Sequence, residues 1–175
     1  LCPDELIIRL TDDDNKWARA FAAESPACPS DILERLAKDL DWQVRGSVAT
    51  NRNCPVEVLG TACADENADV RKAVAGNLNC PIGSLQKLAK DEDRTVRYNV
   101  ASNPNCPLSA LEVLANDEWS RICLVVARNS NCPVSLLQEL AKEQGPSVRE
   151  AVAGNPNCPA STLEVLAKDE DEEVR

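Results

Sequence analysis

The chain has 175 residues with 29 acidic and 19 basic side chains, a net charge of −10 and no histidine. The missing histidine removes the commonest general base, the Ser-His and Cys-His nucleophile pairs and every zinc site that includes imidazole. The acidic balance argues against binding to nucleic acid or to an anionic membrane surface, and no apolar run approaches the roughly 20 residues that span a bilayer. The chain begins at Leu1 and contains no methionine, so we expect it to be a piece of a longer or processed protein.

A Cys-Pro dipeptide recurs every 26 residues from the beginning of the chain to its end. A period of 20–50 residues is the signature of a solenoid, in which each repeat buries its apolar face against its neighbours. We therefore predict one repeat array over 1–175. Its repeats cover 2–27, 28–53, 54–79, 80–105, 106–131 and 132–157, with a partial repeat at 158–175.

Each repeat contains two segments with helical periodicity. The first repeat is irregular and acidic, which is typical of a terminal capping repeat. In the fourth repeat, Leu85, Leu88 and Ala89 lie at the i, i+3 and i+4 positions of one helix face. Pro81 suits the first turn of this helix, and we expect Cys80 to be its N-cap because a residue before proline avoids the α conformation.

The second segment of the same repeat covers 95–103, with Val96 and Val100 on its inner face. The acidic run at 91–93 provides the bend between the two helices. Asn103 and Asn105 favour the turn that follows, because Asn tolerates left-handed backbone and forms Asx turns. No segment alternates with period two, so we predict an all-α chain without strands.

The repeated run LAKDEDxxVRxxVAxN, preceded by P-x-x-x-L-x-x-L, resembles the leucine-rich repeat variant family. That resemblance implies a bacterial α-solenoid with a right-handed superhelix of two-helix repeats, in which the second helix is either α-helical or 3₁₀. The D-x-x-x-x-V-R core is also similar to HEAT-type repeats. The best-known family member carries an iron–sulfur cluster in a cysteine-rich segment ahead of its repeats. Residues 1–27 offer only Cys2 and, just beyond them, Cys28 at the boundaries, both in the repeat phase. We therefore expect no cofactor.

The regular cysteines have two interpretations, a column of metal ligands or a column of small buried residues. Equivalent residues on stacked helices lie about 8–10 Å apart, which is too far for disulfides and leaves one ligand at each level. The closest cysteines are nine residues apart, and metal sites usually show closer pairs. We favour packing, including for Cys63 in the small-residue column, whereas Cys123 occupies the column of arginines. Unclustered cysteines fit a reducing, cytoplasmic location.

Two columns of charged residues recur with the repeat: a column of aspartates and, six residues later, a column of arginines. We interpret them as a structural ladder in which each Arg binds turn carbonyls and an Asp, rather than as acid–base pairs, because they recur at every level. The ladder residues are Asp39, Arg45, Asp65, Arg71, Asp91, Arg97 and Arg149, with Asp13, Arg19, Asp117, Glu143, Asp169 and Arg175 in the same columns.

A variable stripe lies opposite the Val and Ala columns of the second helix, and we expect partners to bind there. In the fifth repeat, the apolar pair Leu124 and Val125 lies between Arg121 and Arg128 on this stripe. Such an exposed apolar patch is typical of an interface. The alternative is that the local helix is rotated and buries the pair. The candidate partner-binding residues are Trp17, Phe21, Gln43, Tyr98, Asn99, Arg121, Leu124, Val125 and Arg128.

Three hypotheses for function follow. The first is a non-enzymatic scaffold that binds a protein or peptide on the second-helix face, with a further end-to-end contact through the partial last repeat. The second is a metal or redox protein of the iron–sulfur type, although its ligand segment is not seen. The third is an enzymatic solenoid, for which no nucleophile motif or Gly-rich phosphate loop is present. We predict no catalytic residue and no metal ligand.

Overall fold

The computed structural model describes residues 3–142 and 145–175, and Cys2 and Glu143 lie outside them. The described residues form thirteen α-helices and no strand, which confirms the all-α prediction. They belong to two compact units, Leu1–Leu88 and Ala89–Arg175. The repeat boundaries given above stay a prediction.

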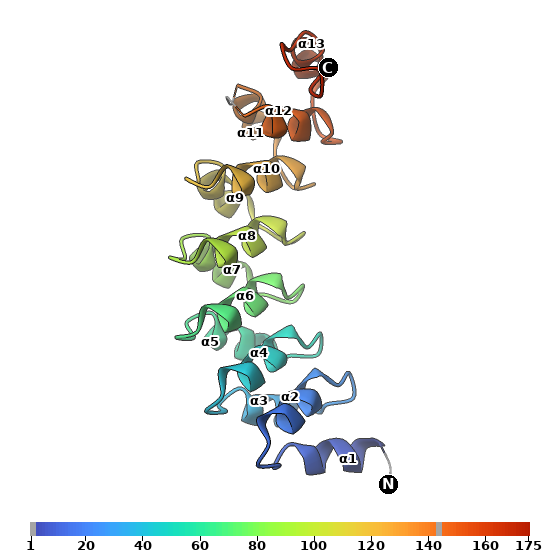
Figure 1. Ribbon diagram of the computed structural model, residues 1–175, viewed down its shortest axis with the longest axis vertical. Coiled ribbons are helices and arrows are strands. Elements are labelled where there is room, and N and C mark those ends of the chain that lie inside the picture. The colour runs from blue at the N-terminus through green and yellow to red at the C-terminus, as the bar shows by residue number, and fades with distance from the viewer. Residues whose placement is uncertain (1–2, 143–144) are drawn as a thin grey trace. The chain divides into compact units, whose positions relative to one another are not determined.

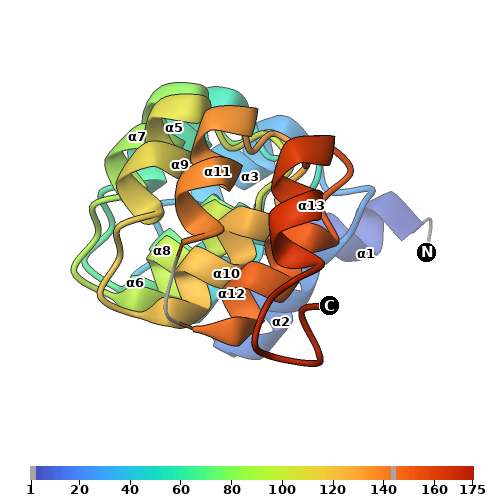
Figure 2. The ribbon, with the colours of Figure 1, turned by 90° about the horizontal axis from the view of Figure 1, so that it is seen from above.

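Unit 1 contains two rows of short helices (Figures 1 and 2). First-position helices α3, α5 and α7 form one row and second-position helices α2, α4 and α6 form the other. The second-position helices pack closely on one another, whereas the first-position helices touch less. The helices are α1 (Pro3–Leu10), α2 (Lys16–Glu24), α3 (Ser30–Leu36), α4 (Trp42–Thr50), α5 (Val56–Ala62), α6 (Ala68–Gly76) and α7 (Ile82–Leu88).

Unit 2 has the same two-row arrangement. Helices α9, α11 and α13 occupy the first position of their repeats, and α8, α10 and α12 the second. The closest packing is again between second-position helices, with α10 lying against both α8 and α12. The helices are α8 (Arg94–Ser102), α9 (Leu108–Leu114), α10 (Ser120–Arg128), α11 (Val134–Leu140), α12 (Pro146–Ala153) and α13 (Ala160–Leu166).

Except in the first repeat, where α1 begins at Pro3, the first helix of each repeat begins one residue later than predicted. Helix α7 starts at Ile82, so Cys80 is not its N-cap. In α3, α5, α9, α11 and α13 the proline itself is the N-cap, and in α3 Pro29 has φ −63° and ψ 151°. A proline ring fixes φ near −65°, which extended backbone accepts as readily as a helix does. The preceding cysteine is therefore one position further from the helix than we expected.

The described second helices are α-helical rather than 3₁₀, and α4, α6, α8 and α10 each end at an asparagine in extended backbone. Asn103 follows α8 with φ −71° and ψ 125°, and its side chain accepts a hydrogen bond from the backbone N–H of Asn105 at 2.8 Å. The predicted Asx turn is thus present. The predicted left-handed conformation is wrong, because no residue in the described ranges has positive φ.

The core of the regular repeats consists of a leucine face from the first helix and a valine–alanine face from the second. In unit 1, Leu33, Leu59 and Leu85 of the first helices and Val44 and Val48 of a second helix are completely buried or nearly so. Each buried leucine or valine contributes about 1.5–3 kcal/mol relative to an exposed one. None of the described helices combines the length and the apolar character needed to cross a membrane.

Candidate functional site

The charged columns of unit 1 join neighbouring repeats through paired hydrogen bonds. Arg45 Nε and Nη2 donate to the two carboxylate oxygens of Asp65 at 2.7 and 2.9 Å, and Nη1 donates to the carbonyls of Asp39 and Leu40 in its own turn. Arg19 binds Asp39 in the same two-pronged way at 2.6 and 3.0 Å. Arg19 and Arg45 therefore each hold their own turn and the turn of the next repeat.

Unit 2 repeats this arrangement. Arg97 donates to Asp117 at 2.6 and 3.1 Å, and Arg149 donates to Asp169 at 2.7 Å with both Nε and Nη2. Arg175 Nη1 donates to the carbonyl of Asp169, as the other arginines do to theirs. The arginines and carboxylates of these pairs are mostly shielded from solvent, so the bonds are protected from water.

The ion pairs lower the pKa of their carboxyl groups. The hydrogen bond from Arg19 lowers the pKa of Asp39, and that from Arg149 lowers the pKa of Asp169 to about 2. Burial alone raises the pKa of Asp65, but the hydrogen bonds from Arg45 and from a backbone N–H outweigh it, so its pKa is also lowered. Such carboxylates are ionised at neutral pH and saturated with donors, which makes them poor proton-transfer groups.

Cys123 interrupts the arginine column in the fifth repeat. Its Sγ lies 3.5 Å from the carbonyl oxygen of Asp117 and 3.3 Å from that of Ala115. In the preceding repeat, Arg97 Nη1 donates to the equivalent turn carbonyl of Asp91 at 2.9 Å. The buried thiol thus keeps a contact with its own turn, but it is too short to reach the next repeat as an arginine does.

A second column, formed by asparagines, joins neighbouring repeats at the C-terminal ends of the second-position helices. Asn77 Nδ2 donates to the carbonyls of Ala49 and Asn51 at 2.7 and 3.0 Å, and its Oδ1 accepts from the backbone N–H of Asn79 at 2.8 Å. Asn51, Asn129 and Asn155 make the equivalent bonds to the preceding repeat. The sequence predicted a turn at Asn103 and Asn105 of this pattern, but it did not predict the hydrogen bonds between repeats.

The cysteines of the Cys-Pro column are small buried residues, as predicted. Cys28, Cys54, Cys80, Cys106 and Cys132 are buried and free, and Cys158 is partly exposed. Burial raises the pKa of Cys54 to about 11 and that of Cys106 to about 12. These thiols are protonated at neutral pH and are therefore weak nucleophiles and weak metal ligands. Cys63 is also buried.

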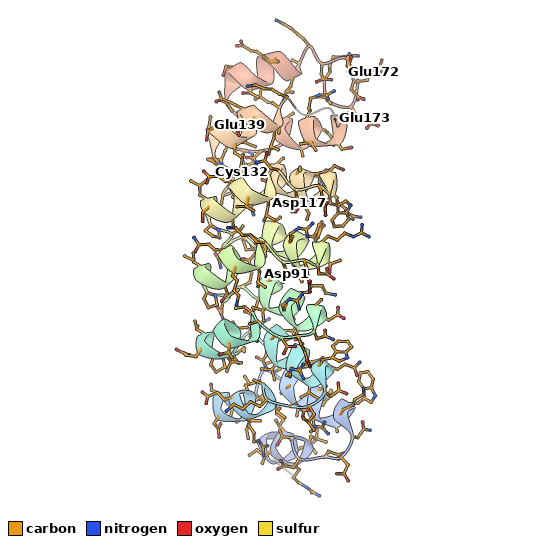
Figure 3. The ribbon with its side chains drawn as sticks, turned by 90° about the vertical axis from the view of Figure 1, so that its left-hand side faces the viewer. Asp91, Asp117, Cys132, Glu139, Glu172 and Glu173 are labelled. Carbon is orange, nitrogen blue, oxygen red and sulfur yellow. The ribbon has the colours of Figure 1, made fainter. Side chains whose placement is uncertain are left out.

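In unit 2, the side chain of Cys132 is completely buried, whereas acidic side chains lie at the surface (Figure 3). Glu139 is exposed on α11, and the side chain of Glu172 beyond α13 is 92% exposed. No group of three or more His, Cys, Asp or Glu side chains that could hold a metal ion occurs among the described residues.

The variable stripe opposite the valine and alanine columns, called the outward stripe below, carries large aromatic side chains in unit 1. Trp17 and Phe21 occupy the i and i+4 positions of α2 and are 60% and 66% exposed. Gln43 of α4 is half-buried, and Gly46 of the same helix has nothing within 4 Å of the position of a Cβ atom. An apolar surface with open space next to it is suited to contact with another chain.

The outward stripe of unit 2 is different in character because it is basic and aromatic. Tyr98 and Asn99 of α8 are half-buried, and the ring of Tyr98 lies 5.9 Å from that of Trp119, between centroids. The guanidinium carbon of Arg121 lies 5.6 Å from the Tyr98 ring centroid, and that of Arg94 lies 4.9 Å from the Trp119 ring centroid. The three tryptophans lie at three different positions of their repeats, and the sequence did not predict this pairing of Tyr98 with Trp119.

Leu124 and Val125 of α10 are half-buried, and Arg128 is exposed. The buried face of α10 is formed by Ile122, Cys123, Val126 and Ala127, which occupy the same positions as the buried residues of the other second helices. The helix is therefore not rotated, and the apolar pair lies at the edge of the outward stripe.

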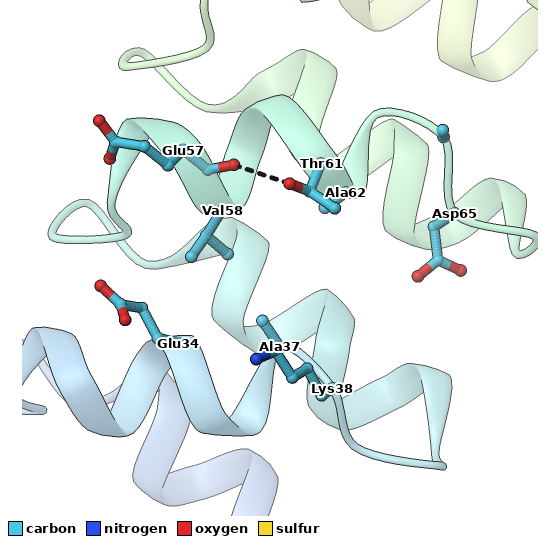
Figure 4. A pocket seen from close by; sticks show the side chains of 9 residues that line it. Glu34, Ala37, Lys38, Glu57, Val58, Thr61, Ala62 and Asp65 are labelled. Carbon is cyan, nitrogen blue, oxygen red and sulfur yellow. Dashed lines mark hydrogen bonds between the residues drawn. The ribbon is translucent and has the colours of Figure 1, made fainter.

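Two open grooves lie in unit 1. One, of about 550 Å³, separates α3 from α5 and is lined by the short side chains of Ala37, Val58 and Ala62 (Figure 4). The carboxylates of Glu34 and Glu57 point the same way at one end of it. The other, of about 600 Å³, is lined by the loops that carry the asparagine column, whose amide groups are already bonded. The first groove reflects the looser packing of the first-position helices.

This chain is similar to known repeat proteins in sequence and in structure. The family described as leucine rich repeat variant matches residues 146–171. No curated protein is similar enough to count as a match. A solved structure described as "a leucine-rich repeat variant with a novel repetitive protein structural motif" is similar to this chain, with a TM-score of 0.73 and 30% identity over 99% of this chain and 69% of that one. An engineered protein is 18% identical with a TM-score of 0.49, over 99% of this chain and 92% of that one. The chain belongs to the leucine-rich repeat variant family.

Proposed function

We propose that this chain is a non-enzymatic repeat scaffold that binds a protein or peptide through the outward stripes of its second-position helices. The observation that carries this proposal is the exposure of Trp17 and Phe21 on α2, at 60% and 66%. Aromatics make up only 3% of the sequence, so two adjacent exposed rings on one helix face are a specific feature. Aromatic side chains dominate the energetics of protein interfaces.

The repeated polar residues support a scaffold rather than a catalyst. The arginine, aspartate and asparagine columns form bonds within and between repeats, and the buried thiols have raised pKa values. The positions that vary from repeat to repeat are those of the outward stripe, where a partner is recognised in repeat proteins. Free buried cysteines fit a reducing compartment, and we infer a cytoplasmic location from them.

The test is affinity capture from a lysate of the source cell, comparing wild type with a Trp17→Ser/Phe21→Ser variant. The control is Val56→Ser/Ile82→Ser, which removes two exposed apolar side chains from the first-position helices of the same unit. The proposal predicts a partner that wild type and the control retain and that the aromatic variant loses. Equal retention by all three proteins contradicts it.

A further inference from the structure

Four side chains in unit 2 form one surface group, which we call the arginine–tryptophan cluster: Arg94, Tyr98, Trp119 and Arg121. The guanidinium carbons of Arg94 and Arg121 lie 4.9 and 5.9 Å from the centroid of the Trp119 ring. Arg121 also lies 5.6 Å from the ring of Tyr98. Stacking on aromatic faces holds each guanidinium group in place and leaves the N–H groups, which lie in the guanidinium plane, able to donate.

Trp119 breaks a local rule of this fold. The equivalent positions before α2, α4, α6 and α8 are Asn15, Asp41, Asn67 and Asp93, and each side chain accepts a hydrogen bond from the helix. Trp119 is the N-cap of α10 and makes no such bond. Loss of a side-chain N-cap destabilises a helix. Departures from local rules of this kind concentrate at functional sites.

The two arginines of the cluster are exposed and form no ion pair with any residue that the structure describes. The neighbouring carboxylates have other partners. Asp117 and Glu118 both interact with Arg97, at 2.6 and 3.5 Å, and Asp93 caps α8. In a chain with a net charge of −10, uncompensated and immobilised arginines at one place are available to an outside anion.

The same face continues along α10. Leu124, Val125 and Arg128 follow Arg121 by three, four and seven residues, so they lie on one side of the helix. Leu124 and Val125 are half-buried and Arg128 is exposed. The cluster is therefore bordered by an apolar step and by a third arginine.

We propose that the arginine–tryptophan cluster binds an acidic peptide segment of a partner protein. Aspartate or glutamate carboxylates of the segment pair with the guanidinium groups, and an apolar side chain of the segment rests on Trp119 or on the Leu124–Val125 step. This assignment rests on the proposed scaffold function and names the chemistry of one partner segment.

Charge favours a peptide over a nucleic acid at this site. Tight nucleic-acid binding commonly uses about six to ten phosphate contacts, whereas this face offers three exposed arginines. The carboxylates of Asp93 and Glu118 on the adjoining turns repel a long polyanion. A short segment with two or three carboxylates matches the number of cations and avoids those turns.

The test uses fluorescence anisotropy with a labelled, terminally blocked peptide that contains three acidic residues and two leucines. Its counterpart has Gln and Asn in place of the acidic residues. Arg94→Gln and Arg121→Gln should each weaken binding of the acidic peptide by about three- to tenfold, because each removes a charge-assisted bond. Arg52→Gln, the same charge change on an exposed loop of unit 1, should leave it unchanged.

Trp119→Asn separates binding from folding. Asparagine caps the equivalent helices α2 and α6, so this variant should raise the Tm by about 2–4 °C. It should also weaken peptide binding about tenfold, since the two arginines lose their stacking surface. A Trp119→Asn variant with a lower Tm and unchanged peptide binding assigns the ring a structural role and overturns the proposal.

Two further results overturn it: equal binding of the charged and uncharged peptides, and tighter binding of a single-stranded oligonucleotide than of the acidic peptide. Partner capture that depends on Trp17 and Phe21 can persist in either case, and then only the assignment of this cluster is lost. Acidic-peptide binding without any captured partner is the converse result, which contradicts the role of α2 and leaves the cluster assigned.

Discussion

Arg45 is held on both sides of a repeat boundary because a guanidinium group has five donors in a fixed plane. Two of its nitrogens bind Asp65 of the next repeat, and the third binds turn carbonyls of its own repeat. The side chains of the pair are only 12% and 10% exposed. A lysine at this position supplies the charge without the fork, so the geometry explains why the column contains arginine.

Arg45→Gln should therefore destabilise the protein by about 2–3 kcal/mol, because it leaves the shielded carboxylate of Asp65 without its cation. Urea denaturation followed by circular dichroism measures this change. The matched control is Lys72→Gln, which breaks an exposed ion pair with Asp69 and should cost less than about 0.5 kcal/mol. Similar losses for both variants contradict the assigned role of the arginine.

At the residue scale, the sequence pattern predicted that the Asp and Arg columns bind each other and that the cysteines at the Cys-Pro position are buried. It did not predict the Tyr98–Trp119 contact, because those residues occupy different positions in their repeats. They come together only because α8 stacks against the turn before α10. Repeat periodicity predicts what recurs at each level. Contacts between unlike positions of neighbouring repeats depend on the three-dimensional stacking.

Within each unit, the second-position helix is the element that joins one repeat to the next. Its packed face carries valine and alanine, and the asparagine at its C-terminal end donates to two carbonyls of the preceding repeat. Asn77 is 7% exposed, and each of its bonds replaces contact with water. A buried amide in this position satisfies backbone carbonyls that the end of the preceding helix leaves open.

Asn77→Asp should destabilise the protein by about 2–4 kcal/mol at neutral pH, because a carboxylate of nearly the same shape cannot donate to the carbonyls of Ala49 and Asn51. Chemical denaturation at pH 7 measures the change. Asn79→Asp is the control, since Asn79 Nδ2 donates to the exposed carbonyl of Arg52, and its cost should be about 1 kcal/mol or less. An Asn77→Asp variant as stable as wild type refutes the role of the asparagine column.

At the scale of elements, the two-helix repeat was predictable because leucine and valine recur at helical spacing. The helix starts were displaced by one residue, since proline's fixed φ suits both an N-cap and a first helical position. The predicted left-handed conformation of the asparagines was wrong for a related reason. Asx turns form in extended backbone as well as beside a left-handed residue, and the donors between repeats cannot be recognised without the neighbouring repeat.

For the whole molecule, two sets of titrating groups limit stability from opposite sides of neutral pH. The pKa values of Asp39, Asp65, Asp117 and Asp169 are lowered, so below about pH 3.8 the unfolded chain takes up protons before the folded one. Burial raises the pKa values of Cys54, Cys80, Cys106 and Cys132 to about 11 or 12 from 9.0. Above about pH 9 the unfolded chain therefore loses protons first.

The Tm should consequently be nearly constant between about pH 5 and 8.5, fall as the pH drops through 3.8 toward 2, and fall again as it rises from 9 toward 12. Differential scanning calorimetry across this range measures both limbs. Cys106→Ala removes one titrating thiol and should make the alkaline fall shallower. The chain has no histidine, so a steep change between pH 6 and 7.5 contradicts this account.

The measurement that tests the central claim most directly is site-specific photo-crosslinking to the captured partner. A photoreactive phenylalanine analogue replaces Phe21 or Arg128 on the outward stripes of the second-position helices, or Val56 or Leu108 on the first-position helices, all exposed positions. A scaffold that binds through its second-position helices should crosslink from positions 21 and 128 and not from 56 and 108. Crosslinks from 56 and 108 with none from 21 and 128 would place the partner on the opposite helices and contradict the claim.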